Sequence, residues 1–175
     1  SLRTLEDGAR IDEAVKHGAK TAVVMGAGLI GLETAIGLEE RGLKVTVVEM
    51  LPQVLPQMLD AEMAKSAQEM LQQKGLNIQV GKPVEEILGS EKATGVAAGG
   101  EHFDGDLVVS AFGVRANTQL AANAGVIMGD TKAIKTNARM ETNVKDVYAI
   151  GDCAESVHIV TQKPALMQFG TVAVR

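Results

Sequence analysis

The sequence predicts an α/β protein built on a Rossmann-like parallel sheet, and residues 20–49 carry most of the evidence. Residues 20–25 and 44–49 each contain a short apolar or β-branched run, which is typical of a strand buried on both faces. Between them, apolar residues recur at helical spacing from Leu29 to Leu38, and Gly42 follows where a helix C-terminus favours positive φ. A strand, a helix and a second strand within about thirty residues form a βαβ unit.

Three glycines follow the first predicted strand in the pattern Gly26-x-Gly28-x-x-Gly31. In a βαβ unit the first glycine allows a tight turn, the second lets a pyrophosphate approach the backbone, and the third lets the helix pack closely. The helix N-terminus then offers unpaired N–H groups and the positive end of its dipole. Glu49 lies eighteen residues after Gly31, where a carboxylate can accept both hydroxyls of an adenosine ribose.

This order of elements indicates a dinucleotide-binding site. Two alternatives are a Gly-rich turn that binds nothing and a methyl-donor nucleotide site, which also uses a Gly-rich loop and an acid after the second strand. Gly31 favours the dinucleotide because it allows close packing of the helix. Glu49 predicts NADH rather than NADPH, because residues 50–57 contain no cation to meet a 2′-phosphate.

Composition narrows the function classes. The chain has 175 residues, of which 46% are hydrophobic, so it is long enough to bury a substantial core. Aromatic residues make up 2% and the net charge is −5, which argues against nucleic-acid binding. No apolar run reaches the length of a membrane span, and Cys153 with three scattered histidines gives no basis for a metal site. We therefore expect a soluble, cytoplasmic protein. Because the chain starts at Ser1, we also expect it to be a fragment.

The remaining pattern extends the parallel sheet. Residues 1–19 predict an amphipathic helix with Leu5, Ile11 and Val15 on its apolar face, and Asp60 can cap a helix that ends near residue 74. The apolar stripe of that second helix, which includes Met63 and Met70, is expected in the core. Residues 76–80 alternate as a third strand.

The pattern changes after residue 84. Short strand-like pieces at 84–88, 94–97 and 101–103 are separated by turn signals and predict an antiparallel three-stranded meander, and residues 106–111 predict a strand that returns to the parallel sheet. Residues 147–150 predict a further buried strand with Asp152 at its carboxyl end, and a last helix is expected from Lys163 onward.

Four motifs lie at residues 2–7, 26–33, 111–118 and 148–154. Together they resemble the pyridine nucleotide–disulfide oxidoreductase family, whose flavoproteins pass electrons from NAD(P)H through FAD. Within the family the chain resembles NADH oxidases, coenzyme A disulfide reductases, and flavoprotein reductases of rubredoxin or nitrite. One departure is Ala116, where the family usually has proline; the change affects loop stiffness more than chemistry.

The resemblance implies a domain organisation and a function. We expect a lead-in segment at 1–19, an NAD-binding domain at 20–118, and a return segment with a partial FAD-binding domain at 119–175. The first flavin domain and the dimerisation domain of the family have no counterpart here, so the FAD site is expected to be incomplete. The intact parent would be a homo-oligomer that passes hydride from NADH to FAD, whose flavin would pass electrons to oxygen, a disulfide or a small redox protein. A stand-alone NAD-binding or sensing module without turnover is the alternative.

The resemblance also implies roles for single residues. Glu33 would lie beside the nicotinamide and pair with a flavin-domain lysine, Gly113 would approach the nicotinamide, and Asp152 would hold the flavin ribityl chain. Dipole stabilisation of Glu33, a strand-end turn at Gly113 and a turn cap at Asp152 are the respective structural alternatives. Cys153 does not match the redox cysteine of the family by position, and no catalytic residue is predicted. The expected cofactor-binding residues are Gly26, Gly28, Leu29, Ile30, Gly31, Glu33, Glu49, Gly113, Gly151 and Asp152.

Overall fold

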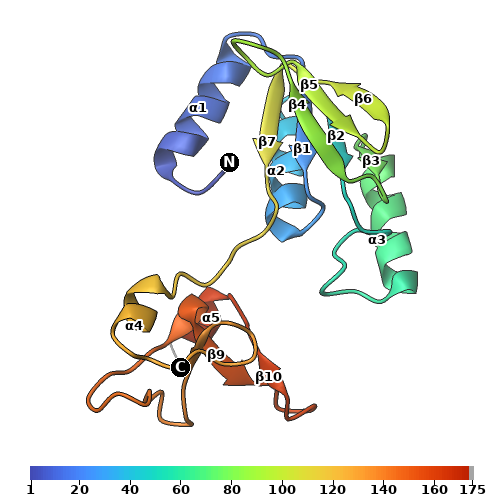
Figure 1. The fold of residues 1–175 in the computed structure, drawn as a ribbon. Helices are drawn as coiled ribbons and strands as arrows, with labels where there is room; N and C mark the ends of the chain where they lie inside the picture. Colours follow the sequence, from blue (N-terminus) through green and yellow to red (C-terminus); the bar gives the residue numbers. More distant parts are fainter. Residues whose placement is uncertain (174–175) are drawn as a thin grey trace. The chain divides into compact units, whose positions relative to one another are not determined.

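The computed structural model describes residues 1–173 and divides the chain into two compact units, Ser1–Gly113 and Val114–Arg175 (Figure 1). The end of the helix expected after Lys163 lies outside the described residues. The predicted domain boundaries after residues 19 and 118 stay predictions.

A four-stranded parallel sheet forms the centre of the first unit, which confirms the predicted fold class (Figure 1). The helix α2 (Leu29–Glu39) joins the first two strands, and α3 (Ala61–Gln73), capped by Asp60 as predicted, joins the second to the third. Gly42 follows α2 with φ +85°. The strands, in spatial order, are β3 (Asn77–Gln79), β2 (Lys44–Val48), β1 (Thr21–Met25) and β7 (Leu107–Ser110).

An antiparallel meander connects β3 to β7, as the turn signals predict. Its strands are β4 (Val84–Leu88), β5 (Gly95–Ala98) and β6 (Glu101–Asp104), in that spatial order. The meander replaces the helix that a parallel crossover usually carries.

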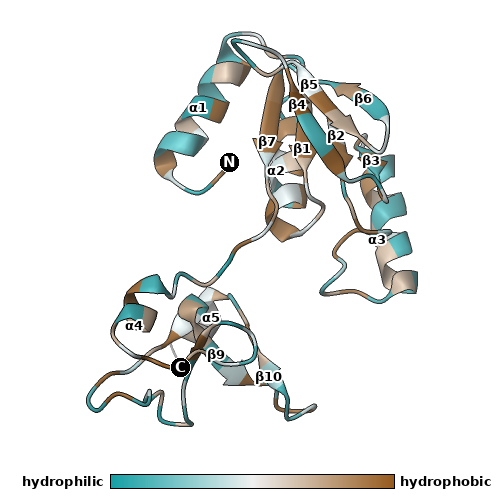
Figure 2. Cartoon of the chain, viewed as in Figure 1, coloured by the Kyte–Doolittle hydropathy of each residue, from teal (hydrophilic) through white to brown (hydrophobic). Residues whose placement is uncertain are grey.

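The two faces of β1 pack against different layers. Ala22 and Val24 belong to the cluster that includes residues of α2 and α3, whereas Val23 and Met25 pack with Val96 and the rest of the meander. Side chains of a strand alternate between faces, so β1 is buried between helices and meander. Its continuous apolar run follows from this position, and Figure 2 shows the hydrophobic colour along the central strands.

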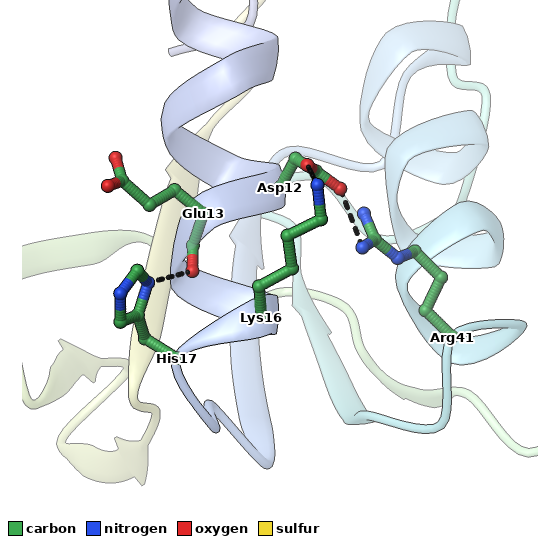
Figure 3. Close-up of polar contacts among 5 residues, drawn as sticks. All are labelled: Asp12, Glu13, Lys16, His17 and Arg41. Carbon is green, nitrogen blue, oxygen red and sulfur yellow. Dashed lines mark hydrogen bonds and ion pairs between the residues drawn. The ribbon is translucent and has the colours of Figure 1, made fainter.

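The lead-in helix α1 (Leu5–Lys16) starts with a capping box between Thr4 and Asp7 and packs Ile11 and Val15 against the helical layer. Its polar face also reaches the turn after α2. The Asp12 carboxylate forms ion pairs with Lys16 of the same helix and with Arg41 just after α2, each at 2.6 Å (Figure 3). These exposed ion pairs contribute little individually.

Three residues of the first unit that the sequence places on buried helix faces are exposed instead. Leu5, expected on the apolar face of α1, is 90% exposed because it lies in the first turn, ahead of Ile11 and Val15, which pack against the core. In α3, Met63 and Met70 are 55% and 62% exposed. The helix instead turns the smaller Ala64 and the partly buried Ala67 and Leu71 toward the core.

The second unit is built from short elements around the buried side chains of Val126, Ile134, Ala149 and Ala154. Its three strands pair in the order β10-β9-β8. The elements are α4 (Gln119–Asn123), β8 (Ile134–Lys135), the 3-10 helix η1 (Gly151–Cys153), β9 (Ala154–Val157), β10 (Pro164–Ala165) and α5 (Gly170–Ala173).

Two predicted elements of this unit are wrong. Residues 147–150 form no strand, because only an isolated bridge from Tyr148 to Glu141 pairs them, and Asp146 just before has a positive φ of 63°. The helix expected from Lys163 begins only at Gly170. Pro164 pairs with Val157 in the hairpin of β9 and β10 instead, so the chain is extended there.

Candidate dinucleotide-binding site

At two positions in and after the loop that follows β1, the packing of the backbone leaves no room for a side chain. Gly26 has φ +108°, and a Cβ there would lie 2.5 Å from the carbonyl oxygen of Ala111, just beyond β7. A Cβ on Gly31 would overlap the carbonyl oxygen of Gly26. The turn off β1 and the close approach of α2 therefore both depend on the absence of a side chain.

Gly28 differs from its two neighbours in the motif. Its φ of −77° suits any residue, and a Cβ there would meet no atom of the chain within 4 Å. It is the N-cap of α2 and offers no side-chain hydrogen bond to the first turn. The N–H groups of Leu29, Ile30 and Gly31 open the helix without partners four residues before them. Nothing in the described chain requires glycine at 28, but an anion seated on these N–H groups would.

Glu49 follows β2 and is the one side chain in the described part of the chain that is both buried and charged, with 9% of its surface exposed. One carboxylate oxygen accepts the Ala27 N–H at 2.7 Å, and the other accepts the Leu51 N–H at 2.8 Å. A carboxylate has about four acceptor positions, so each oxygen keeps one for a further donor. The carboxylate is thus anchored beside the glycine loop with capacity to accept two hydroxyls.

The start of α2 borders a hollow of about 360 Å³ lined by Leu2, Ile30, Glu33 and Thr34. Leu29 and Ile30 are partly exposed, and the Glu33 side chain is exposed. Glu33 lies beyond the first turn of α2, which contains no acid, so the helix dipole acts on it only weakly. Its carboxylate is available to a group outside the helix.

Gly113 ends the first unit three residues after β7. It has φ +87°, and a Cβ there would meet nothing within 4 Å. Because a Cβ placed on either Gly26 or Gly31 would meet Ala111, the chain leaves β7 directly beside the glycine loop. The structure thus brings this end of β7 to the same edge of the sheet as Glu49, the carboxyl edge.

In the second unit, Gly151 and Asp152 lie in η1 rather than at a strand end. Gly151 has φ +74°, and the N-cap of η1 is Ile150, so Asp152 does not cap this turn. The Asp152 side chain is exposed. Cys153 is half-buried, and its thiol donates weakly to the Ile150 carbonyl at 3.5 Å.

The backbone groups that hold Glu49 and the glycine loop were not predicted from the sequence. Ala27 and Leu51 take part through their N–H groups, and Leu55 donates its own N–H to the Ala27 carbonyl at 2.9 Å. Backbone groups carry no residue signature. The only available signal is the spacing of Glu49 from the loop.

The fold and the site together define a Rossmann-like α/β domain. The N-terminus of α2 has no side-chain cap, and the buried acid Glu49 follows β2. The family model described as pyridine nucleotide-disulphide oxidoreductase matches residues 1–172. The chain belongs to this family, which confirms the resemblance drawn from its motifs. The predicted cofactors, NAD and FAD, are those of the family.

Known proteins agree with this assignment. An NADH oxidase of Methanocaldococcus jannaschii is 46% identical over 175 residues, covering 99% of this chain and 39% of that protein. The structure of an NAD-dependent persulfide reductase from A. fulgidus matches with a TM-score of 0.95 at 39% identity, covering 99% of this chain and 32% of that one. A water-forming NADH oxidase from Lactobacillus brevis, bound to NADH, matches with a TM-score of 0.86 at 29% identity, covering 95% and 36%. The chain therefore spans about a third of the length of these relatives.

Within the described residues, no helix is both long and apolar enough to cross a membrane. The same residues contain no group of three or more histidine, cysteine or acidic side chains placed to hold a metal ion.

Proposed function

We propose that this chain is the NADH-binding part of a flavin-dependent oxidoreductase. Such an enzyme passes hydride from NADH to FAD, and the reduced flavin passes electrons on to oxygen, a disulfide or a small redox protein. The observation that carries the proposal is Gly28. A Cβ there would meet no atom of the chain, its φ of −77° suits any residue, and the first N–H groups of α2 have no side-chain cap. The solved relative from Lactobacillus brevis, whose structure contains NADH, supports the choice of ligand.

The residues present fit the adenosine half of NADH. The pyrophosphate would lie against Gly28 and accept hydrogen bonds from the first N–H groups of α2, where the helix dipole also favours negative charge. Glu49 would accept both ribose hydroxyls with its two remaining acceptor positions. Gly26 and Gly31 keep the loop and helix in the conformation that this requires.

Glu33 and Gly113 would lie near the nicotinamide, and Gly151 with Asp152 would contribute to the flavin site. NADH supplies the hydride and FAD accepts it. The chain's own residues bind and orient the two cofactors. The homo-oligomeric state of the parent and its cytoplasmic location stay predictions.

NADH should bind more tightly than NADPH. Glu49 would repel a 2′-phosphate, and residues 50–57 contain no cation. Lys82 donates its backbone N–H to the Glu49 carbonyl, but its ammonium contacts Glu101 at 2.6 Å and lies 5.1 Å from the centre of the Phe103 ring. The Lys82 ammonium is thus paired with β6 of the meander.

Calorimetry with NADH tests the proposal on the wild type, Gly28→Val and Gly37→Val. Gly37 lies exposed on the same helix, and a Cβ there also meets nothing within 4 Å, so it is a matched control. We expect Gly28→Val to abolish binding and Gly37→Val to keep it. Wild-type NADPH affinity should be roughly ten- to a hundred-fold lower than that for NADH. Equal NADH affinity in both variants would refute the placement of the pyrophosphate.

A further inference from the structure

We propose that Glu49 is also a positioning residue, which holds the glycine loop in its binding conformation before any nucleotide arrives. The consequence for ligand affinity rests on the proposed function, whereas the effect on the loop itself does not. Accepting ribose hydroxyls would need only an exposed acid at the end of β2. The structure instead shows an acid whose polar groups are already engaged with three separate loops.

Glu49 makes hydrogen bonds through both its backbone groups and its carboxylate. Its backbone N–H donates to the Gln79 carbonyl at 2.8 Å, and its carbonyl accepts the Lys82 N–H at 2.9 Å. Its carboxylate accepts one N–H from Ala27 in the glycine loop and one from Leu51 in the loop after β2. One residue therefore ties together the loops that follow β1, β2 and β3 at the carboxyl edge of the sheet.

Ala27 is the loop residue that is held most firmly. The residue is fully buried, its N–H is held by Glu49, and its carbonyl accepts the Leu55 N–H. Without the Glu49 carboxylate, the Ala27 N–H would be buried and unpaired, which is costly. The loop would relieve that cost by moving, and Gly28, the next residue, would move with it.

The two carboxylate oxygens are both needed for this role. Glutamine at position 49 keeps one acceptor oxygen but presents an NH₂ group to one of the two backbone donors. Aspartate keeps both oxygens but is one methylene shorter. Glu49→Gln therefore removes one of the two anchoring bonds with little change in volume, and Glu49→Asp tests the reach.

This role changes what is expected of a variant designed to accept NADPH. Removing the acid relieves the repulsion of a 2′-phosphate, but it also loosens the loop that binds the pyrophosphate. Glu49→Ala should thus narrow the gap between the two cofactors chiefly by weakening NADH, with little gain for NADPH.

The first experiment uses the ligand-free protein and measures backbone amide hydrogen exchange by NMR. In Glu49→Asp we expect the Ala27 amide, and in Glu49→Gln the amide of Ala27 or Leu51 that faces the new NH₂ group, to exchange on the order of tenfold faster, while Val24 and Val47 amides in the sheet are unchanged. Glu91→Gln, in the exposed turn between β4 and β5, is the matched control and should leave Ala27 unchanged. Unchanged Ala27 exchange in both Glu49 variants would overturn the proposal.

The second experiment separates positioning from ribose binding. The probe is an NADH analogue with 2′,3′-dideoxyadenosine, which keeps the pyrophosphate and lacks the hydroxyls that Glu49 would accept. Glu49→Gln should weaken binding of this analogue by about fivefold or more. Unchanged analogue affinity beside weakened NADH affinity would show that the acid acts on the hydroxyls alone, which overturns the inference and leaves the proposed function intact. If the wild type binds neither molecule, the proposed function fails, and amide exchange alone decides the positioning role.

Discussion

The two units of this chain bury their apolar residues to very different extents. Among the residues that the structure describes, the first unit contains two clusters of fourteen and five buried hydrophobic residues on the two faces of its sheet, and the second contains one cluster of four. The second unit also exposes large apolar side chains such as Ile159 and Val160, at 82% and 84%. Burial of apolar area is the main source of folding free energy, so the first unit should hold most of the stability.

The difference predicts that the two units behave unlike each other when produced separately. Residues 1–113 should show one cooperative thermal transition by circular dichroism and should bind NADH. Residues 114–175 should show no cooperative transition and should bind no FAD, because the five buried hydrophobic residues described there do not offset the ordering of about sixty residues.

Tyr148, the only tyrosine of the chain, gives a specific signal for the second unit in the full-length protein, which has no tryptophan. If its fluorescence changes at the same temperature as the helical circular dichroism, the two units unfold together and do not differ in stability.

A contrast of two glycines tests how tightly the first unit is built around its loop. Gly31→Ala should lower the free energy of unfolding by on the order of 2–4 kcal/mol, because the new Cβ meets the backbone carbonyl of Gly26. Gly28→Ala should stay within about 1 kcal/mol of the wild type, because its Cβ would enter open space. Urea denaturation measures both. A Gly31→Ala variant as stable as the wild type would show that α2 shifts freely against β1.

The same contrast explains what the sequence could predict. The strands β1, β2 and β5 are mostly buried on both faces, so their apolar runs predict them, and Asp60 and Gly42 mark helix ends by their own chemistry. Where burial is partial, the pattern misleads. The methionines of α3 are apolar and helically spaced, yet the smaller Ala64 occupies the buried position.

In the second unit, an apolar run no longer indicates a strand. Residues 147–150 are as apolar as β1, but only Ala149 is buried, and backbone pairing is limited to one bridge. The candidate site follows the same division. Gly26, Gly31 and Glu49 are placed by strong local chemistry, whereas the backbone donors at Ala27 and Leu51 have no residue signature.

Truncation of one buried valine in each unit gives a smaller and more direct comparison. Val47 is completely buried in β2, and Val126 is nearly so in the second unit. Val47→Ala should lower stability by about 2 kcal/mol, and Val126→Ala by about 1 kcal/mol, because a thinner core relaxes more easily around a cavity. Circular dichroism and Tyr148 fluorescence report the two changes separately. Equal losses would mean that the second unit is packed as tightly as the first.

The smallest expected effect concerns pH and the amino edge of the sheet. Asp106, just before β7, accepts hydrogen bonds from the Lys20 N–H at 2.8 Å, the Thr21 hydroxyl at 2.9 Å and the Thr21 N–H at 3.0 Å. These bonds lower the pKa of the Asp106 carboxyl below its ordinary value of 3.8, in the order Lys20 N–H, Thr21 hydroxyl, Thr21 N–H. Because the folded pKa lies below the unfolded one, the stabilisation is fully present above pH of about 4 and is lost as pH falls through the folded pKa.

Asp106→Asn isolates this contribution, because asparagine keeps an acceptor oxygen but carries no charge. The wild type should unfold at a higher temperature than Asp106→Asn at pH 6, and the difference should shrink steadily as pH is lowered below about 4. Asp104→Asn, at the exposed end of β6, is the control and should show a smaller difference at pH 6. The carboxyl joins the start of β1 to the start of β7, so the effect belongs to the first unit, and Tyr148 fluorescence should not follow it. A pH-independent gap between wild type and Asp106→Asn would mean that the lost bonds matter through geometry alone and not through the charge of the carboxylate.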